Sequence, residues 1–295
     1  MKRIAIITGV TSFLGKSTAR FLLQSDFLVF GIVRPDSNNK DKLKDLKGLK
    51  LVEIDFDSIS SNDFNNLNNA NTIEAIHNST KNNPDITFIH FGWGSTLDRN
   101  NFMAQMLNVD YSMKVLEFAK ILKAKRFIFA GSQAEYSDSA YGLAKLRFAK
   151  NAVKYLSDCD TKFIHMKIFS IYGKEDRETS LIKTLVKACK ENKSFDLSSC
   201  DFKWNFLYIN DFVCIVYKLI DKNVSSGDYD VASDDTRLLK DYCYEVKDVL
   251  NSSSVLNFGA REDSSEKFAI PNIKKLELAI GAFSFTKFRD GILSI

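Results

Sequence analysis

Three residues in the middle of the chain have the types and the spacing of an acid–base catalyst. Tyr141 and Lys145 are four positions apart, so they share one face if the segment is helical. A tyrosine with a pKa near 10 is a poor proton donor at neutral pH, but a neighbouring lysine cation favours the phenolate and lowers that pKa. Ser132 follows an apolar segment and can reach the same phenolic oxygen. We therefore expect Tyr141, Lys145 and Ser132 to form a proton-transfer site.

A glycine turn near the N-terminus predicts a dinucleotide site. An apolar segment, residues 4–8, runs into this turn, and a helical pattern follows it. Backbone N–H groups and the helix dipole attract a pyrophosphate there. Gly9 allows the tight turn and Gly15 lets the helix pack closely on the strand, while Ser12 takes the place of a middle glycine. The expected cofactor contacts in the turn are Gly9, Thr11, Ser12, Phe13, Leu14 and Gly15.

The same turn has a second interpretation. Gly15-Lys16-Ser17 resembles the end of a P-loop. A P-loop has four residues between its glycines, whereas five separate Gly9 from Gly15. This spacing disfavours a phosphoryl-transfer site.

The end of the second apolar segment, residues 28–33, bears on which dinucleotide is bound. Arg34 follows it directly and can pair with the 2′-phosphate of NADP, with Ser37 and Lys40 nearby. Asp36 lies two residues later and can instead hold the ribose diol of NAD. We predict NADP as the cofactor and keep NAD as the alternative.

Apolar segments alternate with helical patterns in the first half of the chain. The expected strands are residues 4–8, 28–33, 51–54, 87–91, 126–130 and 163–168, and the expected helices include 16–24 and 115–121. This alternation predicts an α/β fold, a Rossmann-type doubly wound parallel sheet with right-handed crossovers. Beyond residue 168 the alternation weakens, with a helical pattern at 180–192 and a strand at 206–209.

These patterns predict two domains. We expect an NAD(P)-binding Rossmann domain over residues 1–168, to which a segment at about 205–232 returns. A smaller, discontinuous α/β substrate-binding domain is expected over residues 169–204 and 233–295. The segment 58–83 is rich in asparagine and serine and is predicted to be a helical connection, with a surface insertion as the alternative.

Composition disfavours several other classes of protein. The net charge of the 295 residues is only +4, and Asp41 and Asp45 interrupt the basic cluster at 40–50, so we expect no nucleic-acid partner. Five cysteines without a CxxC motif fit reduced thiols in a cytoplasmic protein. The three histidines lack ligand spacing, which argues against a metal site. No segment approaches the ~20 apolar residues of a membrane span, so no membrane partner is expected.

Several motifs together resemble the extended short-chain dehydrogenase/reductase family, the NAD(P)-dependent epimerase/dehydratase group that acts on nucleotide sugars. The resemblance runs through nearly the whole chain. Its matching segments are Thr8–Gly15 (TGxxGFxG), Asp55-Phe56 (an adenine-contacting acid), His90–Trp93 (HxA), Asn108-Val109 (NV), Phe169–Gly173 (FNVYGP) and Asn205–Asp211 ((R)DFxYVDD).

This resemblance implies a role for each matching residue. Tyr141 would exchange a proton with a sugar hydroxyl, Ser132 would bond the developing oxyanion, and Lys145 would hold the nicotinamide ribose. Further implied cofactor contacts are Asp55, Phe56, Phe91, Gly92, Trp93, Asn108 and Ser170. The substrate contacts would be Gln133, Trp93, Trp204 and Arg261. A homodimer would form through the helices near Ser132 and Asn108.

The chain departs from the family pattern at informative places. Gln133 and Ala134 stand where family dehydratases have an Asp-Glu pair, and Glu135 should point elsewhere on an extended segment. We therefore argue against 4,6-dehydratase chemistry. Lys167, Lys174 and Trp204 replace the usual Arg, Pro and Arg, which puts the inherited sugar and diphosphate contacts in question.

Three functions follow, in order of preference. The first is NADPH-dependent reduction at C4 of a 4-keto-6-deoxyhexose linked to a nucleoside diphosphate, for surface polysaccharide synthesis. The second is a nucleotide-sugar 4-epimerase that retains NAD. The third is a non-catalytic NAD(P)-binding sensor, which the presence of Tyr141 and Lys145 disfavours.

Overall fold

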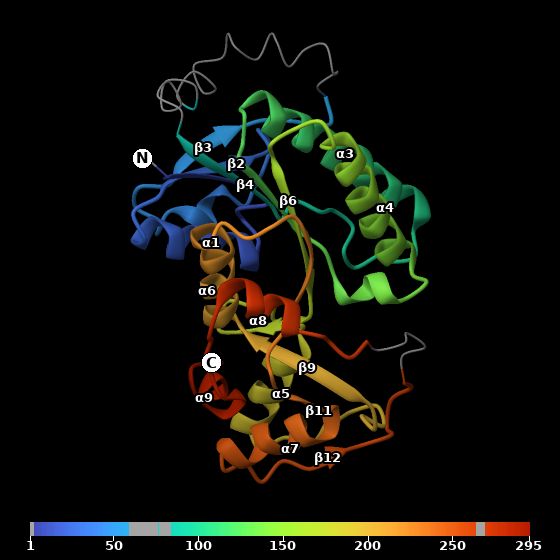
Figure 1. The fold of residues 1–295 in the computed structure, drawn as a ribbon. Helices are drawn as coiled ribbons and strands as arrows, with labels where there is room; N and C mark the ends of the chain where they lie inside the picture. The colour runs from blue at the N-terminus through green and yellow to red at the C-terminus, as the bar shows by residue number, and fades with distance from the viewer. Residues whose placement is uncertain (1–2, 59–75, 77–83, 264–268) are drawn as a thin grey trace.

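A seven-stranded parallel sheet forms the larger part of the molecule (Figure 1). The computed structural model describes residues 3–58, 76, 84–263 and 269–295. In the order β10-β6-β5-β4-β1-β2-β3, the strands are β10 (Gly227–Val231), β6 (Lys162–Ile168), β5 (Arg126–Ala130), β4 (Asp85–His90), β1 (Arg3–Thr8), β2 (Leu28–Val33) and β3 (Lys50–Glu53). The predicted doubly wound Rossmann-type sheet is confirmed.

Helices cover both faces of this sheet, because its strands are apolar on both sides. On β1, Ile4 and Ile6 belong to the core under α3 (Phe102–Ile121) and α4 (Ala140–Tyr155). Ala5 and Ile7 belong to the opposite core, under α1 (Phe13–Gln24) and α6 (Ile209–Asp221). This alternation is the period of two that a strand imposes on its side chains. Both α1 and α3 begin earlier than the patterns at 16–24 and 115–121 predicted.

A second group of elements lies beside the carboxyl ends of the strands (Figure 1). It contains a three-stranded sheet in the order β11-β9-β7 and a short pair, β12-β8. Its strands are β7 (Ser170–Tyr172), β8 (Phe195–Asp196), β9 (Lys203–Tyr208), β11 (Thr236–Leu238) and β12 (Leu256–Asn257), and its helices include α5 (Leu181–Lys190), α7 (Leu239–Val249) and α9 (Phe288–Leu293). The rings of Tyr172, Tyr242 and Phe288 pack together in its core.

The chain returns from this second group to the large sheet. Residues 209–231 form α6 and then β10, which pairs with β6 in parallel. One further helix, α8 (Lys274–Ile280), packs with α6 and β10, because Leu276 and Ile280 join the same core. The segment 233–295 is therefore divided between the two groups. The domain boundaries given above stay a prediction.

The sequence also predicted a helical connection over residues 58–83 and a cytoplasmic location. The helical connection predicted over 58–83 falls almost entirely outside the described residues. Within the described ranges, no helix combines the length and the apolar character that a membrane span needs. The cytoplasmic location stays a prediction.

Candidate functional site

The glycine turn places backbone donors at the start of α1. Gly9 has a φ of 66°, and a Cβ built on it would lie 2.7 Å from the backbone nitrogen of Gly92. Ser12 caps the helix, since its Oγ accepts the Gly15 N–H at 3.1 Å. The N–H groups of Phe13 and Leu14 precede any helical acceptor. With no acidic residue in the first turn of α1, this end of the helix suits an anionic diphosphate.

A buried hydrogen-bond chain connects this turn to α3. Thr8 Oγ1 lies 2.6 Å from His90 Nδ1, and His90 Nε2 lies 2.9 Å from Ser112 Oγ. Ser112 donates to the Asn108 carbonyl oxygen at 2.7 Å, so its hydroxyl must accept from His90 Nε2. His90 Nδ1 then accepts from Thr8. This assignment requires a neutral ring, which agrees with a pKa of about 3 that results from burial and then from the charge of Lys145.

Asn108 uses its side chain on the loop that follows β4. Its Oδ1 accepts the Gly94 N–H at 2.7 Å, and its Nδ2 donates to the Gly94 carbonyl at 3.1 Å. This side chain therefore positions a loop instead of presenting its amide directly to a ligand. Phe91 and Gly92, at the start of the same loop, lie against Gly9.

The structure brings Ser132, Tyr141 and Lys145 together. Ser132 begins a 3₁₀ turn, η3 (Gln133–Tyr136), and Tyr141 and Lys145 lie in the first turns of α4. The Ser132 side chain acts to lower the pKa of the Tyr141 phenol, and Lys145 Nζ lies 5.3 Å from the centre of the Tyr141 ring. The sequence spacing of four is thus realised on one helix face.

Close packing of α4 on η3 makes this meeting possible. Ser139 caps α4 by accepting the Gly142 N–H at 3.2 Å, which fixes where the helix begins. A Cβ built on Gly142 would lie 1.9 Å from the Ala134 carbonyl oxygen. Only glycine lets the helix approach the turn closely enough for Tyr141 to meet Ser132.

Lys145 is almost completely buried, with 3% of its surface exposed. Its ammonium group donates to the Ala130 carbonyl oxygen at 2.5 Å and lies 4.2 Å from the centre of the Trp93 ring. Burial lowers the pKa of Lys145 to about 7, and the charge of Glu135 opposes that shift.

The electrostatics of Tyr141 differ from the sequence expectation. Burial raises its pKa to about 12, and the groups that oppose this rise are Arg99 and Ser132. Lys145 directs its ammonium to Ala130 and Trp93, and the cation that lowers the pKa of Tyr141 is Arg99. Arg99 was not predicted, because no motif marks a residue in the loop before α3.

Trp93, Gln133 and Ser170 surround this group. The Trp93 ring stands edge-on to Tyr141, with centroids 6.2 Å apart, and its Nε1 donates to Gln105 at 2.9 Å. Gln133 Nε2 donates to Ser170 Oγ at 3.3 Å, which joins η3 to β7. These predicted contacts for cofactor and substrate thus lie beside the predicted catalytic residues.

The predicted adenosine contacts lie at the ends of β2 and β3. Arg34 directly follows β2 and Asp55 lies two residues beyond β3, and these strands pair in parallel, so the two residues lie at neighbouring carboxyl ends of the sheet. The Arg34 side chain is exposed. Phe56 was expected to contact the cofactor, but its ring is wholly buried against Tyr111 and Phe118. Its side chain is a core residue, because the strand end turns it inward.

Two predicted substrate residues lie in the second group of elements. Trp204, on β9, packs against Phe202 and Phe206. Arg261 is exposed, and its guanidinium lies 5.7 Å from the Phe195 ring. The structure places both residues around β8 and β9, and their role in substrate binding stays a prediction.

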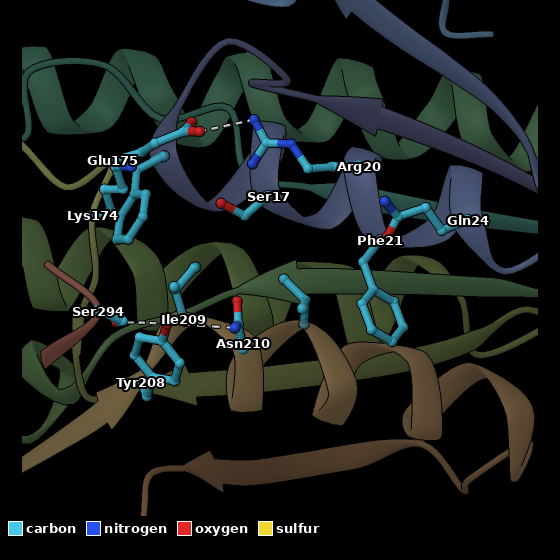
Figure 2. A pocket seen from close by; sticks show the side chains of 12 residues that line it. Ser17, Arg20, Phe21, Gln24, Lys174, Glu175, Tyr208, Ile209, Asn210 and Ser294 are labelled. Atoms are coloured by element: carbon cyan, nitrogen blue, oxygen red, sulfur yellow. Dashed lines mark hydrogen bonds and ion pairs between the residues drawn. The ribbon is translucent and has the colours of Figure 1, made fainter. Parts of the chain in front are cut away.

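A cavity of about 270 Å³ lies between α1 and α6 (Figure 2). Arg20 crosses from α1 to Glu175 with a 2.8 Å ion pair, and Tyr208 bonds Ser294 on the facing wall. Its lining includes Phe13 but none of the three predicted catalytic residues. The part of the chain that the structure describes contains no cluster of His, Cys, Asp and Glu suited to a metal ion.

Comparison with known proteins adds relatives and structural neighbours. The chain is 25% identical to the CDP-abequose synthase of Salmonella muenchen over 265 residues, which cover 86% of this chain and 83% of that protein. The UDP-glucose 4-epimerase of Thermotoga maritima, solved with UDP-glucose, has a TM-score of 0.79 at 11% identity, over 98% of this chain and 96% of the other. For the enzyme WbmH of Bordetella bronchiseptica, solved with NAD+, the TM-score is 0.76 at 16% identity, over 100% and 97%.

These structural likenesses show a shared fold. A family model provides the classification, and it matches residues 5–232 of this chain. The matched region includes the glycine turn, Ser132 and the Tyr141–Lys145 pair. The chain belongs to the NAD-dependent epimerase/dehydratase family.

Proposed function

We propose that this protein is an NAD(P)-dependent oxidoreductase that reduces the C4 ketone of a nucleoside-diphosphate 4-keto-6-deoxyhexose for surface polysaccharide synthesis. The observation that carries the proposal is that Ser132, at the start of η3, and Tyr141, at the start of α4, meet beside the Lys145 ammonium, which lies 5.3 Å from the tyrosine ring. The similarity to CDP-abequose synthases along most of both chains supports a nucleotide-activated sugar as the substrate.

The glycine turn fits a dinucleotide. A Cβ on Gly15 would lie 2.3 Å from the Gly9 carbonyl oxygen, so helix and turn are packed as closely as a phosphate cradle requires. The turn would hold the diphosphate, and Asp55 would contact the adenine. The exposed Arg34 supports NADP, while neighbours solved with NAD keep that cofactor as the alternative. When bound, the cofactor supplies a hydride.

Tyr141 would supply the proton that accompanies the hydride. A ketone becomes an alcohol when a hydride reaches its carbon and a proton reaches its oxygen. With its pKa raised to about 12, Tyr141 carries its proton at neutral pH and is ready to donate it. Ser132 and Arg99 would then stabilise the phenolate, and solvent would return the proton. Lys145 would hold the nicotinamide ribose.

The residues after Ser132 support reduction over elimination of water. Dehydration needs an acid and a base beside the sugar. Gln133 is an amide bonded to Ser170, and Ala134 has no titratable group. Glu135 is buried against His165. The 4-epimerase alternative uses the same tyrosine and is supported by the epimerases among the structural neighbours.

One experiment separates the three functions. The purified protein is incubated with NADPH or NADH and a panel of nucleotide-linked sugars, which contains both 4-keto-6-deoxyhexoses and hexoses with a C4 hydroxyl, and absorbance is followed at 340 nm (the reduced nicotinamide band). A reductase consumes the reduced cofactor in step with the sugar and releases it oxidised. An epimerase inverts C4 of the hexoses that carry a hydroxyl there, with no net absorbance change, and keeps its cofactor bound. Cofactor binding without any turnover on the panel would contradict the proposal and favour a sensor.

The proposed assembly is a homodimer formed through α3 and α4. Apolar side chains are exposed on both helices, including Met103 and Leu107 on α3 and Leu143 and Val153 on α4. Apolar residues gathered on one exposed surface are typical of protein interfaces. A second copy of the same surface would cover them.

A further inference from the structure

A buried histidine lies between two carboxylates close to Ser132. His165, on β6, has its Nε2 3.0 Å from Glu135 and its Nδ1 3.0 Å from Asp228 Oδ1. The side chains of His165 and Glu135 are buried, whereas 55% of the Asp228 side chain is exposed. Burial lowers the pKa of His165, but the hydrogen bonds to Asp228 and Glu135 outweigh that effect and raise it above its usual value, which favours the imidazolium.

Glu135 is joined directly to Ser132. The Ser132 backbone N–H donates to Glu135 Oε1 at 2.8 Å, and Ser132 Oγ accepts the Ala134 N–H at 3.1 Å. These reciprocal bonds form a capping box that bends the chain into η3. Because Oγ already accepts from Ala134, its own proton is available for Tyr141. The position of the Ser132 hydroxyl therefore depends on Glu135.

The charge of Glu135 also acts on Lys145. It raises the pKa of that buried lysine, against the lowering caused by burial. The charged groups facing His165 are Glu135 from η3 and Asp228 from β10, and Asp228 also pairs with Lys167 of β6 at 3.4 Å. The flat side of the ring is stacked on Phe129 of β5 at 5.4 Å.

We propose that Glu135 is a positioning residue of the Tyr141 site and that protonated His165 holds it in place. Glu135 fixes the turn that carries Ser132 and keeps a carboxylate charge near the Lys145 ammonium. Neither residue touches the reacting atoms. The role rests on the proposed function, since it is a role in placing Ser132 and Lys145 for proton transfer.

The test begins with Glu135→Gln. The glutamine oxygen can still accept from the Ser132 N–H, so the turn is kept while the charge is removed. We expect kcat to fall about 10- to 100-fold, which is the range typical of residues that orient a functional side chain without contacting the substrate. The alkaline limb of the kcat profile, where Lys145 loses its proton, should move to lower pH. Asp230→Asn is the matched control, because Asp230 lies on β10 but bonds Tyr136 at 2.8 Å.

His165→Gln provides a second, independent variant. Without the imidazolium, buried Glu135 loses its counter-charge and the hydrogen bond that holds its carboxylate in place. The pH profile should then resemble that of Glu135→Gln, while thermal denaturation confirms that each variant is folded. Wild-type kcat and an unchanged profile in Glu135→Gln would overturn the proposal.

Two measurements work without a sugar substrate. Nitrogen-15 NMR of His165 should show an imidazolium near neutral pH, which deprotonates at lower pH in Glu135→Gln than in wild type. The pH dependence of NADPH binding, followed by nicotinamide fluorescence, should shift in the same direction. A wild type that turns over no sugar but shows both shifts would refute the proposed function and keep the positioning role. A neutral His165, or identical binding profiles, would refute the positioning role alone.

Discussion

Arg99 and Tyr141 are linked twice, through the backbone and through the side chains. The Tyr141 N–H donates to the Arg99 carbonyl oxygen at 2.9 Å, and the Arg99 guanidinium lies 5.2 Å from the Tyr141 ring. A cation therefore faces a phenol that burial keeps protonated. This arrangement stabilises the phenolate only after the proton has left, which is the condition for a proton donor.

Replacing Tyr141 by Phe should remove the proton donor and leave the fold intact. We expect kcat to fall ~100- to 10,000-fold, the usual contribution of a positioned acid. Binding of NADPH, measured by fluorescence, should be largely kept. Tyr136→Phe is the matched control, because its hydroxyl bonds Asp230. Unchanged turnover in Tyr141→Phe would remove Tyr141 from the catalytic assignment.

Lys145→Met should stabilise the protein in a pH-dependent way. Folding lowers the pKa of Lys145 from 10.5 to about 7, so the folded state binds fewer protons than the unfolded state between these values. The wild-type fold therefore gains stability from this group as pH rises through that window. We expect a higher Tm for Lys145→Met at about pH 6, with the gain shrinking toward about pH 10. Lys150→Met, exposed on the same helix, should show no such trend.

Gly9→Ala and Gly259→Ala form a matched pair. Both glycines have positive φ, 66° and 78°, so alanine strains either backbone by ~1–2 kcal/mol. Only Gly9 faces other backbone, at 2.7 Å, while the space around Gly259 is open. Urea denaturation should show the larger loss for Gly9→Ala, together with weaker NADPH binding. Equal losses in both variants would contradict the close contact between Gly9 and Gly92.

Arg34→Ala should change the choice of cofactor. A hydrogen-bonded ion pair with a 2′-phosphate contributes ~1.5–3 kcal/mol, so KM for NADPH should rise about 10- to 100-fold. KM for NADH should change little. Lys40→Ala is the control, since the Lys40 ammonium already pairs with Glu53 at 2.5 Å. An equal loss for both cofactors would argue against recognition of the 2′-phosphate.

Leu107→Asp should separate the proposed homodimer. A charge in the centre of an apolar interface is left buried and unpaired. Sedimentation velocity of the wild type should give a dimer and that of the variant a monomer. Leu278→Asp is the control, because Leu278 is 88% exposed on α8, away from α3 and α4. A monomeric wild type would rule out the dimer.

Periodicity and spacing were sufficient to predict most of the large sheet and the proximity of Tyr141 and Lys145, whose catalytic role stays a prediction. Apolar segments of the expected length became β1, β2, β4, β5 and β6, because buried parallel strands have a simple pattern. Tyr141 and Lys145 lie close together because residues four positions apart share one face of a helix. Spacing could not predict residues that reach the site through long-range contacts. Arg99 is one of these residues.

The sequence analysis did not predict the contact between Glu135 and Ser132. The segment after Ser132 was expected to be extended, whereas it forms a 3₁₀ turn that brings Glu135 back to the Ser132 N–H. The signal was present, since Ser132 and Glu135 have the spacing of a capping box. His165 gave no such signal, because its partners Glu135 and Asp228 lie far away in the sequence.

The place of β10 at the edge of the sheet has a consequence for synthesis of the chain. β10 covers the outer edge of β6, yet the ribosome makes it only after the whole of β7 to α6. Until Val231 has emerged, the nascent sheet ends in an open strand with unpaired backbone groups, the surface that invites pairing with other chains. A chain that stalls before Val231 would therefore be a target for chaperones and proteases.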